Sequence, residues 1–238
     1  MPGPDLAAIQ AVVLDAGGVL VIPDADAIRR GLGALGGPSP DDEACRRAHY
    51  AAMAELDRRG VVDWPSIDQW FATDLGVPSD RLEESVAVVE DVYLVQPWRP
   101  IAGAAEVLHR LDAIGYQLAV VSNATGSMEE QLATHAICSV DGGACVQVAI
   151  VVDSAVVGVE KPDPAIFTFA LDALGLDPAQ CIYVGDTVFF DVNGARAAGL
   201  VPAHVDPFGD CGADDHLHLT CLEELLELLP SRVTSSSG

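Results

Sequence analysis

The stretch Ala11-Val12-Val13-Leu14-Asp15-Ala16-Gly17-Gly18-Val19-Leu20 decides the fold. Its first four residues are apolar and two of them are β-branched, which predicts a short buried strand. The strand ends at one carboxylate, Asp15, and two glycines follow it closely. An acid and a flexible turn at the end of a strand lie at the carboxyl edge of a sheet, where open parallel α/β folds bind ligands. An ordinary turn opened by an aspartate has the same local pattern, so the rest of the chain must separate the two interpretations.

Length and composition limit the classes of protein to which the chain can belong. A chain of 238 residues can bury one good core, or one core with a smaller appended module. Half of the residues are apolar, yet no apolar run reaches the roughly 18 residues that a membrane span needs. Residues 1–10 lack the basic start and apolar centre of a signal peptide. We therefore expect a cytoplasmic protein whose six cysteines are reduced thiols.

The chain is strongly acidic, with a formal net charge of -24. Because nucleic acids and anionic membranes repel such a surface, we expect neither as a partner. A phosphorylated substrate would need local cations that outweigh this field, which favours a bound metal ion. Eleven of the twelve basic residues are arginine, and the only lysine is Lys161. A single lysine suggests a compact ammonium at a tight site, although chance placement gives the same count.

Residues 21–98 read as helices rather than strands. Helical patterns cover residues 41–59, 66–75 and 80–94, and the last of these opens on a sequence that resembles a capping box. We predict a separate small helical domain here, inserted into a core formed by residues 1–20 and 99–232. The Ser-rich residues 233–238 are predicted to be a disordered tail.

From Gly103 onward the pattern alternates between helix and strand. Such alternation implies right-handed crossovers and a Rossmann-like parallel sheet flanked by helices, an α/β fold. The predicted strands cover residues 117–121, 146–152, 181–184 and 201–205, and the predicted helices cover residues 104–114, 127–135, 164–174, 193–198 and 222–229.

Polar residues follow several of these strands. Asp15 follows the first strand, Ser122-Asn123 the second and Gly185-Asp186 the fourth, while Asp191 comes five residues later and Lys161 lies in a loop before a helix. In a parallel sheet such ends share one edge, so the side chains can converge. Carboxylates suit a divalent cation, and a hydroxyl and an ammonium suit an oxyanion. Each signal is weak alone, because an aspartate pair at this spacing is more often a turn and a helix start.

Taken in order, the motifs resemble those of a known family. Four stretches are similar to the four motifs of the haloacid dehalogenase superfamily of hydrolases: Asp15-Ala16-Gly17-Gly18-Val19-Leu20, Val121-Ser122-Asn123, Lys161-Pro162-Asp163-Pro164 and Gly185-Asp186. The resemblance covers about residues 11–229, and its most specific part is Glu160-Lys161-Pro162-Asp163-Pro164 followed by Ile166-Phe167. It implies that the helical domain of residues 21–98 is a cap inserted after the first motif.

The resemblance implies a Mg²⁺-dependent phosphohydrolase that acts on a small phosphorylated metabolite. Asp15 would be the nucleophile and would form an aspartyl-phosphate, which splits one hard displacement into two easier ones. Mg²⁺ would be held by the Asp15 carboxylate, the Gly17 carbonyl and Asp186. Asp191 would be a further ligand or a support for the site. The sequence does not specify an oligomeric state.

The same resemblance implies a phosphoryl-binding set. Ser122, Asn123 and the backbone amides around Gly17-Gly18 would hold the phosphoryl oxygens. Lys161 would neutralise the charge that develops on the phosphoryl group and on Asp15. The implied catalytic residues are therefore Asp15, Ser122 and Lys161.

The sequence departs from the family at Gly17. Most phosphatases of the superfamily carry a second aspartate there, which protonates the leaving group, and such general acid–base help is typically worth ~10²–10⁴ in rate. The substrate could have a leaving group that needs little protonation, such as that of a sugar-1-phosphate or an acyl phosphate. Another acid could take over, with Asp24 and Asp26 nearest in sequence. Otherwise the protein is a weak relative that binds a phosphorylated ligand or partner.

The superfamily also contains 2-haloacid dehalogenases, whose aspartate attacks carbon without a metal. That chemistry would not need the acid at Gly185-Asp186, so the phosphatase is favoured. Other groups have simple structural interpretations. The spacing of four potential ligands fits no common zinc module: Cys211, His216, His218 and Cys221. We expect this segment to be a surface turn that leads into a strand and a helix. Three histidines on helical patterns are predicted to be surface or half-buried: His49, His109 and His135.

Overall fold

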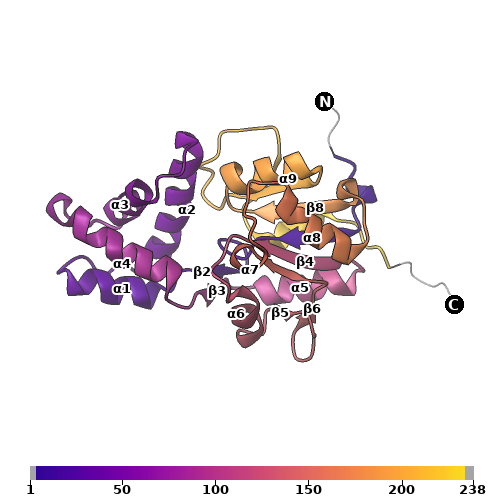
Figure 1. The fold of residues 1–238 in the computed structure, drawn as a ribbon, viewed down its shortest axis with the longest axis horizontal. Helices are drawn as coiled ribbons and strands as arrows, with labels where there is room; N and C mark the ends of the chain where they lie inside the picture. The colour runs from indigo at the N-terminus through magenta and orange to yellow at the C-terminus, as the bar shows by residue number, and fades with distance from the viewer. Residues whose placement is uncertain (1–3, 234–238) are drawn as a thin grey trace.

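The computed structural model describes residues 4–233. Figure 1 shows a sheet with its helices at one end of the molecule and the helices α1–α4 gathered at the other. The six strands of the sheet are all parallel and lie in the order β10-β9-β8-β1-β4-β7. Their bounds are β1 (Ala11–Leu14), β4 (Gln117–Ser122), β7 (Val151–Asp153), β8 (Cys181–Gly185), β9 (Val201–Val205) and β10 (Leu217–Leu219). The predicted α/β class with a Rossmann-like parallel sheet is confirmed.

Strand β1 lies at the centre of the sheet because all four of its residues are apolar. Successive side chains of a strand point to opposite faces. Accordingly, Val12 and Leu14 belong to one hydrophobic cluster, and Ala11 and Val13 belong to another. A strand that is buried on both faces is typical of a parallel sheet with helices on each side.

Helices cover both faces of the sheet. On the face of Val12, the cluster includes residues from α5 (Ala104–Ala113), α6 (Met128–Thr134) and α10 (Leu225–Leu228). On the face of Val13, it includes residues from α8 (Ala165–Leu174) and α9 (Asn193–Ala198). The shorter helical segments are η1 (Leu6–Ala8), α7 (Ser154–Val157), η3 (Pro178–Gln180), the π-helical turn η4 (Val188–Val192) and η5 (Leu222–Glu224).

The sheet order creates a crevice beside β1. From β1 the chain moves to β4 and β7 on one side, and later to β8, β9 and β10 on the other. Open α/β sheets bind ligands outside the carboxyl ends of the strands at such a switch in direction. The ends of β1, β4 and β8 are therefore the expected location of a site.

The inserted helices (α1–α4) lie between two short strands, β2 (Val21–Ile22) and β3 (Arg99–Pro100), which pair antiparallel where the chain leaves and rejoins the core. They form their own hydrophobic cluster, which includes Leu56 and Phe71. Their bounds are α1 (Ala25–Ala34), α2 (Asp42–Arg59), α3 (Trp64–Asp74), η2 (Ser79–Arg81) and α4 (Leu82–Leu94). The division into separate domains stays a prediction. Apart from Val233, the predicted tail lies outside the described residues.

Two local predictions were wrong. The apolar run 146–152 is not one strand: β6 (Val146–Gln147) pairs with β5 (Cys138–Ser139), and only the end of the run joins the main sheet as β7. The capping-box motif at Asp80 lies in the short turn η2, and helix α4 begins at Leu82 without a side-chain cap. In the described part of the chain, no helix is both long enough and apolar enough to cross a bilayer.

Replacing Leu56 by alanine is expected to lower the free energy of unfolding by about 2–5 kcal/mol, because this fully buried side chain fills the cluster of the inserted helices. Leu94→Ala is the matched control, since Leu94 is 61% exposed, and it should cost less than about 1 kcal/mol. Urea unfolding followed by tryptophan fluorescence measures both. Equal stability of the two variants would contradict the packing described here.

The same variants test the division into domains. The three tryptophans lie at positions 64, 70 and 98, so fluorescence follows mainly the inserted helices, whereas far-ultraviolet circular dichroism also follows the sheet and its helices. Separate domains predict that Leu56→Ala shifts the fluorescence transition to lower urea and leaves a second circular-dichroism transition in place. A single transition that moves equally in both signals would refute the division.

Candidate active site

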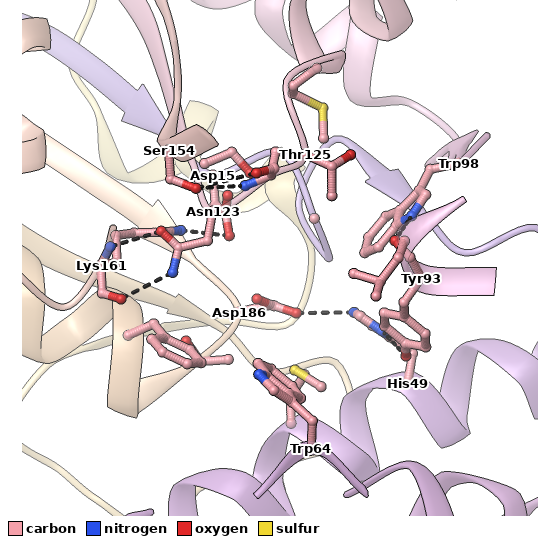
Figure 2. Close-up of a pocket in the computed structure, with 18 of the residues that line it drawn as sticks. Asp15, His49, Trp64, Tyr93, Trp98, Asn123, Thr125, Ser154, Lys161 and Asp186 are labelled. Atoms are coloured by element: carbon pink, nitrogen blue, oxygen red, sulfur yellow. Dashed lines mark hydrogen bonds and ion pairs between the residues drawn. The ribbon is translucent and has the colours of Figure 1, made fainter. Parts of the chain in front are cut away.

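The carboxyl ends of β1, β4 and β8 open into a pocket of about 710 Å³ that the inserted helices also line. This volume lies within the range of small-molecule sites, about 300–1,000 Å³. Figure 2 shows charged residues from the core on one side of the pocket and aromatic residues on the other. Seven of the predicted site residues line it together: Asp15, Gly17, Ser122, Asn123, Lys161, Asp186 and Asp191. The roles assigned to these residues stay predictions.

Asp15 lies directly after β1 and is held at both carboxylate oxygens. Its Oδ1 accepts a hydrogen bond from the backbone N–H of Ala16 at 2.7 Å, and its Oδ2 lies 2.8 Å from Nζ of Lys161. Burial raises the pKa of Asp15 to about 7; Lys161 opposes this shift, and the negative charges of Asp191 and Asp186 add to it. A further cation near Asp15 would therefore favour its ionised form.

Lys161 is 2% exposed and touches three oxygen atoms. Besides Asp15, its Nζ donates to Asp191 Oδ1 at 2.6 Å and to the Tyr183 hydroxyl at 2.9 Å. Burial disfavours the charged ammonium, but the charges of Asp15 and Asp191 outweigh this effect and raise the pKa of Lys161. Lys161 is therefore a fixed positive charge beside Asp15.

Asp191 lies in the turn η4 and accepts hydrogen bonds at both oxygens. Its Oδ1 faces Lys161 and Tyr183, and its Oδ2 accepts from the backbone N–H and the hydroxyl of Thr187 at 3.0 and 2.6 Å. Burial opposes ionisation, but Lys161 and Thr187 outweigh it and lower the pKa of Asp191. Of the two roles predicted for Asp191, this arrangement favours support of Lys161 over direct binding of a cation.

The Asn123 side chain holds the loop that carries Lys161. Its Nδ2 donates to the Lys161 carbonyl at 3.0 Å, and its Oδ1 accepts from the Lys161 N–H at 2.7 Å. Figure 2 shows this reciprocal pair. Both polar atoms of the side chain are thus used on the backbone of Lys161, which leaves the main chain of Asn123 and the neighbouring Ser122 to meet a ligand.

Asp186 follows β8 and is contacted by a residue of the inserted helices. His49 of α2 places Nε2 3.0 Å from Asp186 Oδ2, and its Nδ1 lies 2.9 Å from the Tyr93 hydroxyl. His49 is only 2% exposed, so its prediction as a surface or half-buried residue was wrong. The signal was present in the i, i+4 spacing of Cys45, His49 and Met53, which shows that His49 lies on the buried face of α2.

The two glycines after Asp15 each allow a close approach. A Cβ at Gly17 would lie 3.0 Å from Cζ3 of Trp98, so the indole fills the space beside this position. Gly18 has a φ of 65°, and a Cβ there would overlap the Asp186 carboxylate. The Gly18 carbonyl accepts a hydrogen bond from the Tyr50 hydroxyl of α2 at 2.7 Å. Gly18 therefore lies behind Asp186 rather than in the pocket lining.

The donor set fits a hard divalent cation. Asp15, Asp186 and Asp191 each offer a carboxylate oxygen, and these oxygens lie within 4.8 Å of one another. Three buried carboxylates against the single ammonium of Lys161 leave an excess of negative charge. Mg²⁺ prefers oxygen ligands and is commonly bound through one or two carboxylates. Asp15 and Asp186, with the backbone of Gly17, are the groups that could hold it.

Other predicted candidates lie away from the pocket. Asp24 caps α1 and pairs with Arg99 at 3.0 Å, and Asp26 pairs with Arg29 and Arg99. Neither acid lines the pocket, so both were wrong as substitutes for the missing aspartate. Two residues were not among the predicted site residues, Tyr183 and Thr187, whose hydroxyls hold Lys161 and Asp191. Thr187 directly follows Asp186, but no pattern marked Tyr183 out from an ordinary strand residue.

Comparison with known proteins gives one consistent family. Residues 9–199 match the family model of the haloacid dehalogenase-like hydrolases. Haloacid dehalogenase-like hydrolase domain-containing protein 3 of Mus musculus is 28% identical over 202 residues, covering 80% of this chain and 78% of that protein. Glyceraldehyde 3-phosphate phosphatase of Pyrococcus abyssi is 32% identical over 156 residues, covering 63% and 61%. A solved dehalogenase structure has a TM-score of 0.61 at 22% identity, covering 93% of this chain and 97% of its own.

Replacing Lys161 by methionine is expected to cost about 3–5 kcal/mol of stability, because two buried carboxylates, Asp15 and Asp191, lose their cation. The double variant Lys161→Met/Asp191→Asn should recover part of this loss, since it removes one of the two charges. Urea unfolding of both variants and the wild type measures the recovery. A double variant no more stable than Lys161→Met would contradict this electrostatic account.

Gly18→Ala is expected to weaken Mg²⁺ binding by at least about 10-fold, since the new Cβ displaces Asp186. It should also cost about 1–2 kcal/mol of backbone strain. Gly17→Ala is the matched control, because a small movement of the Trp98 ring relieves its contact. Calorimetric titration with Mg²⁺ distinguishes them, and equal affinities would argue against Asp186 as a ligand.

Proposed function

The chain belongs to the haloacid dehalogenase-like hydrolase family, and from this premise we propose that it is a Mg²⁺-dependent phosphohydrolase of a small phosphorylated metabolite. The observation that carries the proposal is the buried Lys161 ammonium, 2.8 Å from Asp15 at the floor of the pocket. This contact places a nucleophilic carboxylate beside a positive charge, which suits the anionic oxygens of a phosphoryl group. The phosphatase named among the relatives supports the same chemistry.

Asp15 is the proposed nucleophile. A carboxylate oxygen attacks the phosphorus atom, the new O–P bond forms an aspartyl-phosphate, and the bond from phosphorus to the leaving oxygen breaks. Water then attacks the phosphorus of the intermediate, which releases inorganic phosphate and restores the Asp15 carboxylate. The hydrogen bond from Ala16 and the contact with Lys161 fix the orientation of the carboxylate for this attack.

Lys161 and its neighbours prepare the site for the charge that develops on the phosphoryl oxygens. Because Lys161 is held by Asp191, Tyr183 and the Asn123 loop before the substrate arrives, little reorganisation is needed during the reaction. Ser122, at the end of β4, lines the same pocket and can donate its hydroxyl to a phosphoryl oxygen. Mg²⁺ bound by Asp15, Asp186 and the Gly17 backbone would supply further neutralisation of phosphoryl charge.

At Gly17 the leaving group meets Trp98 rather than an acid, and the acids of the inserted helices that line the pocket are Asp68 and Glu90. Gly17 has no side chain to transfer a proton, and the Trp98 indole fills the neighbouring space. Both ring nitrogens of His49 already have partners in Asp186 and Tyr93. Substrates whose leaving group is stable without protonation are therefore favoured, and Asp68, whose pKa burial raises to about 7, is the remaining candidate proton donor of the pocket.

The wall opposite Lys161 selects the body of the substrate. Aromatic side chains from the inserted helices, from η4 and from the segment just before β3 line the pocket, so a largely apolar leaving group fits better than a heavily charged one. The residues are Trp64, Phe71, Tyr93, Trp98 and Phe190. The inserted helices also cover the site, which excludes bulky macromolecular substrates.

A panel of phosphorylated metabolites, assayed for phosphate release, tests the proposal. Release should require Mg²⁺, and Asp15→Asn should reduce it by at least about 10⁴-fold, since the nucleophile is lost. Asp172→Asn, at an exposed acid of α8, is the control and should retain wild-type rates. Chloride release from 2-chloropropionate without metal would instead establish a dehalogenase. Binding without turnover would establish a ligand-binding relative.

Aryl phosphates of graded leaving-group pKa test the missing proton donor. Without a general acid, log(kcat/KM) should fall steeply as the pKa of the leaving phenol rises, because negative charge accumulates on the departing oxygen. The slope is measured at fixed pH and saturating Mg²⁺. A flat dependence, with the chemical step rate-limiting, would show that some other group donates the proton.

A further inference from the structure

A second group of potential ligands lies at the carboxyl end of β9. His204 belongs to β9 and His218 to β10, and the two residues are direct neighbours across the paired strands. Cys211 and His216 come from the connection between these strands. One ligand atom from each of the four residues lies within 4.8 Å of the others. Cys221, the other candidate ligand of this stretch of sequence, is exposed and is not part of the group.

Hydrogen bonds fix which nitrogen each imidazole can offer. His204 Nε2 lies 3.1 Å from the Asp186 carbonyl, and His218 Nε2 lies 2.8 Å from the Ala213 carbonyl. His216 Nδ1 lies 2.8 Å from Asp215 Oδ1. Because a carbonyl or carboxylate oxygen only accepts, each of these nitrogens donates, and the opposite nitrogen of each ring carries a lone pair. Metal-binding histidines are oriented by outer hydrogen bonds of this kind.

One of those lone pairs has no partner in the protein. Nδ1 of His204 is buried and finds no hydrogen-bond partner among the described residues, and His204 itself is only 5% exposed. Leaving a buried polar atom unsatisfied costs roughly 1–3 kcal/mol. The unpaired atom belongs to a ring whose centroid lies 5.4 and 5.8 Å from those of His216 and His218, in the same cluster as the Cys211 thiol. A cation at their centre would satisfy it.

The remaining ligands are suited to a cation that binds nitrogen and sulfur. Sγ of Cys211 and Nε2 of His216 are 3.8 Å apart. A tetrahedral zinc ion, with Zn–S of about 2.3 Å and Zn–N of about 2.0 Å, separates its ligand atoms by roughly 3.5 Å.

We propose that His204, Cys211, His216 and His218 form a closed, structural site for a zinc-like transition-metal ion. On binding, the Cys211 thiol releases its proton to solvent and coordinates as a thiolate, while the three imidazoles coordinate through their lone pairs. Four protein ligands leave no open position, which is typical of structural rather than catalytic zinc. The nitrogen and sulfur donors distinguish this site from the oxygen donors of Asp15 and Asp186.

The site would fasten the β9–β10 connection to the core. Phe208 of this connection packs against Tyr50 of α2, and the guanidinium groups of Arg46 and Arg47 lie over its ring. His204 meanwhile donates to the backbone carbonyl of Asp186. A bound ion would therefore stabilise both the loop that contacts α2 and the backbone of Asp186, the proposed magnesium ligand.

Zinc content and cobalt spectra test the site on the full-length protein. After dialysis against a weak chelator, wild-type protein should retain about one zinc ion per chain, as for a four-ligand site. The Co²⁺-substituted protein should show tetrahedral d–d bands and a sulfur-to-cobalt charge-transfer band. Cys211→Ser should abolish that band and weaken zinc binding by more than about 100-fold. His204→Asn should likewise weaken zinc binding.

Two controls keep the outcome unambiguous. Cys221→Ser removes an exposed thiol outside the cluster, and Asp15→Asn alters the oxygen-donor site; both should keep the zinc content and the charge-transfer band. The cobalt titration of chelator-treated wild type needs no variant and so does not depend on whether one folds. Wild type without tight zinc or a charge-transfer band would overturn the proposal. So would loss of the band in Cys221→Ser with retention in Cys211→Ser.

Discussion

The buried contact of Lys161 with Asp15 and Asp191 is the interaction on which the rest of the core site depends. An ammonium with two carboxylates in the interior is stable only when nearly every donor and acceptor is satisfied. Tyr183 and Thr187 complete this requirement, and Asn123 fixes the loop that carries the lysine. These groups come from different strands and loops, so the parallel sheet must form before the charges can meet. The fold and the site therefore require one another.

The inserted helices contribute to the same site through a small number of contacts. His49 of α2 reaches Asp186, which follows β8, and Tyr50 reaches Gly18 in the loop after β1. Asp57 of the same helix accepts hydrogen bonds from the backbone N–H groups at the start of η4, at 2.8 and 2.7 Å. Helix α2 is thus attached to the segment that carries Asp191. Movement of this helix would therefore shift both carboxylates that follow β8, Asp186 and Asp191.

The sequence predicted the parts of the structure that depend on local patterns. The buried strand before Asp15, the alternation after Gly103 and the helices of residues 41–94 follow from periodicity and from turn residues. The convergence of Asp15, Lys161 and Asp186 was predicted because parallel strand ends share an edge. The hydrogen bond from Lys161 to Tyr183 could not be predicted, because the sequence pattern around Tyr183 is that of any buried strand. The packing of Trp98 against Gly17 could not be predicted either, because it joins segments far apart in the chain. The contact of His204 with His218 depends on the pairing of β9 with β10.

The central claim is that Asp15, activated beside Lys161, carries the phosphoryl group during turnover. Rapid acid quenching during steady-state turnover, followed by peptide mapping by mass spectrometry, tests it most directly. The account predicts one phosphoryl group on Asp15, and its loss on treatment with hydroxylamine, which cleaves acyl phosphates but not phosphate esters. A phosphoryl group on another residue during turnover, or one on this peptide that resists hydroxylamine, would contradict it.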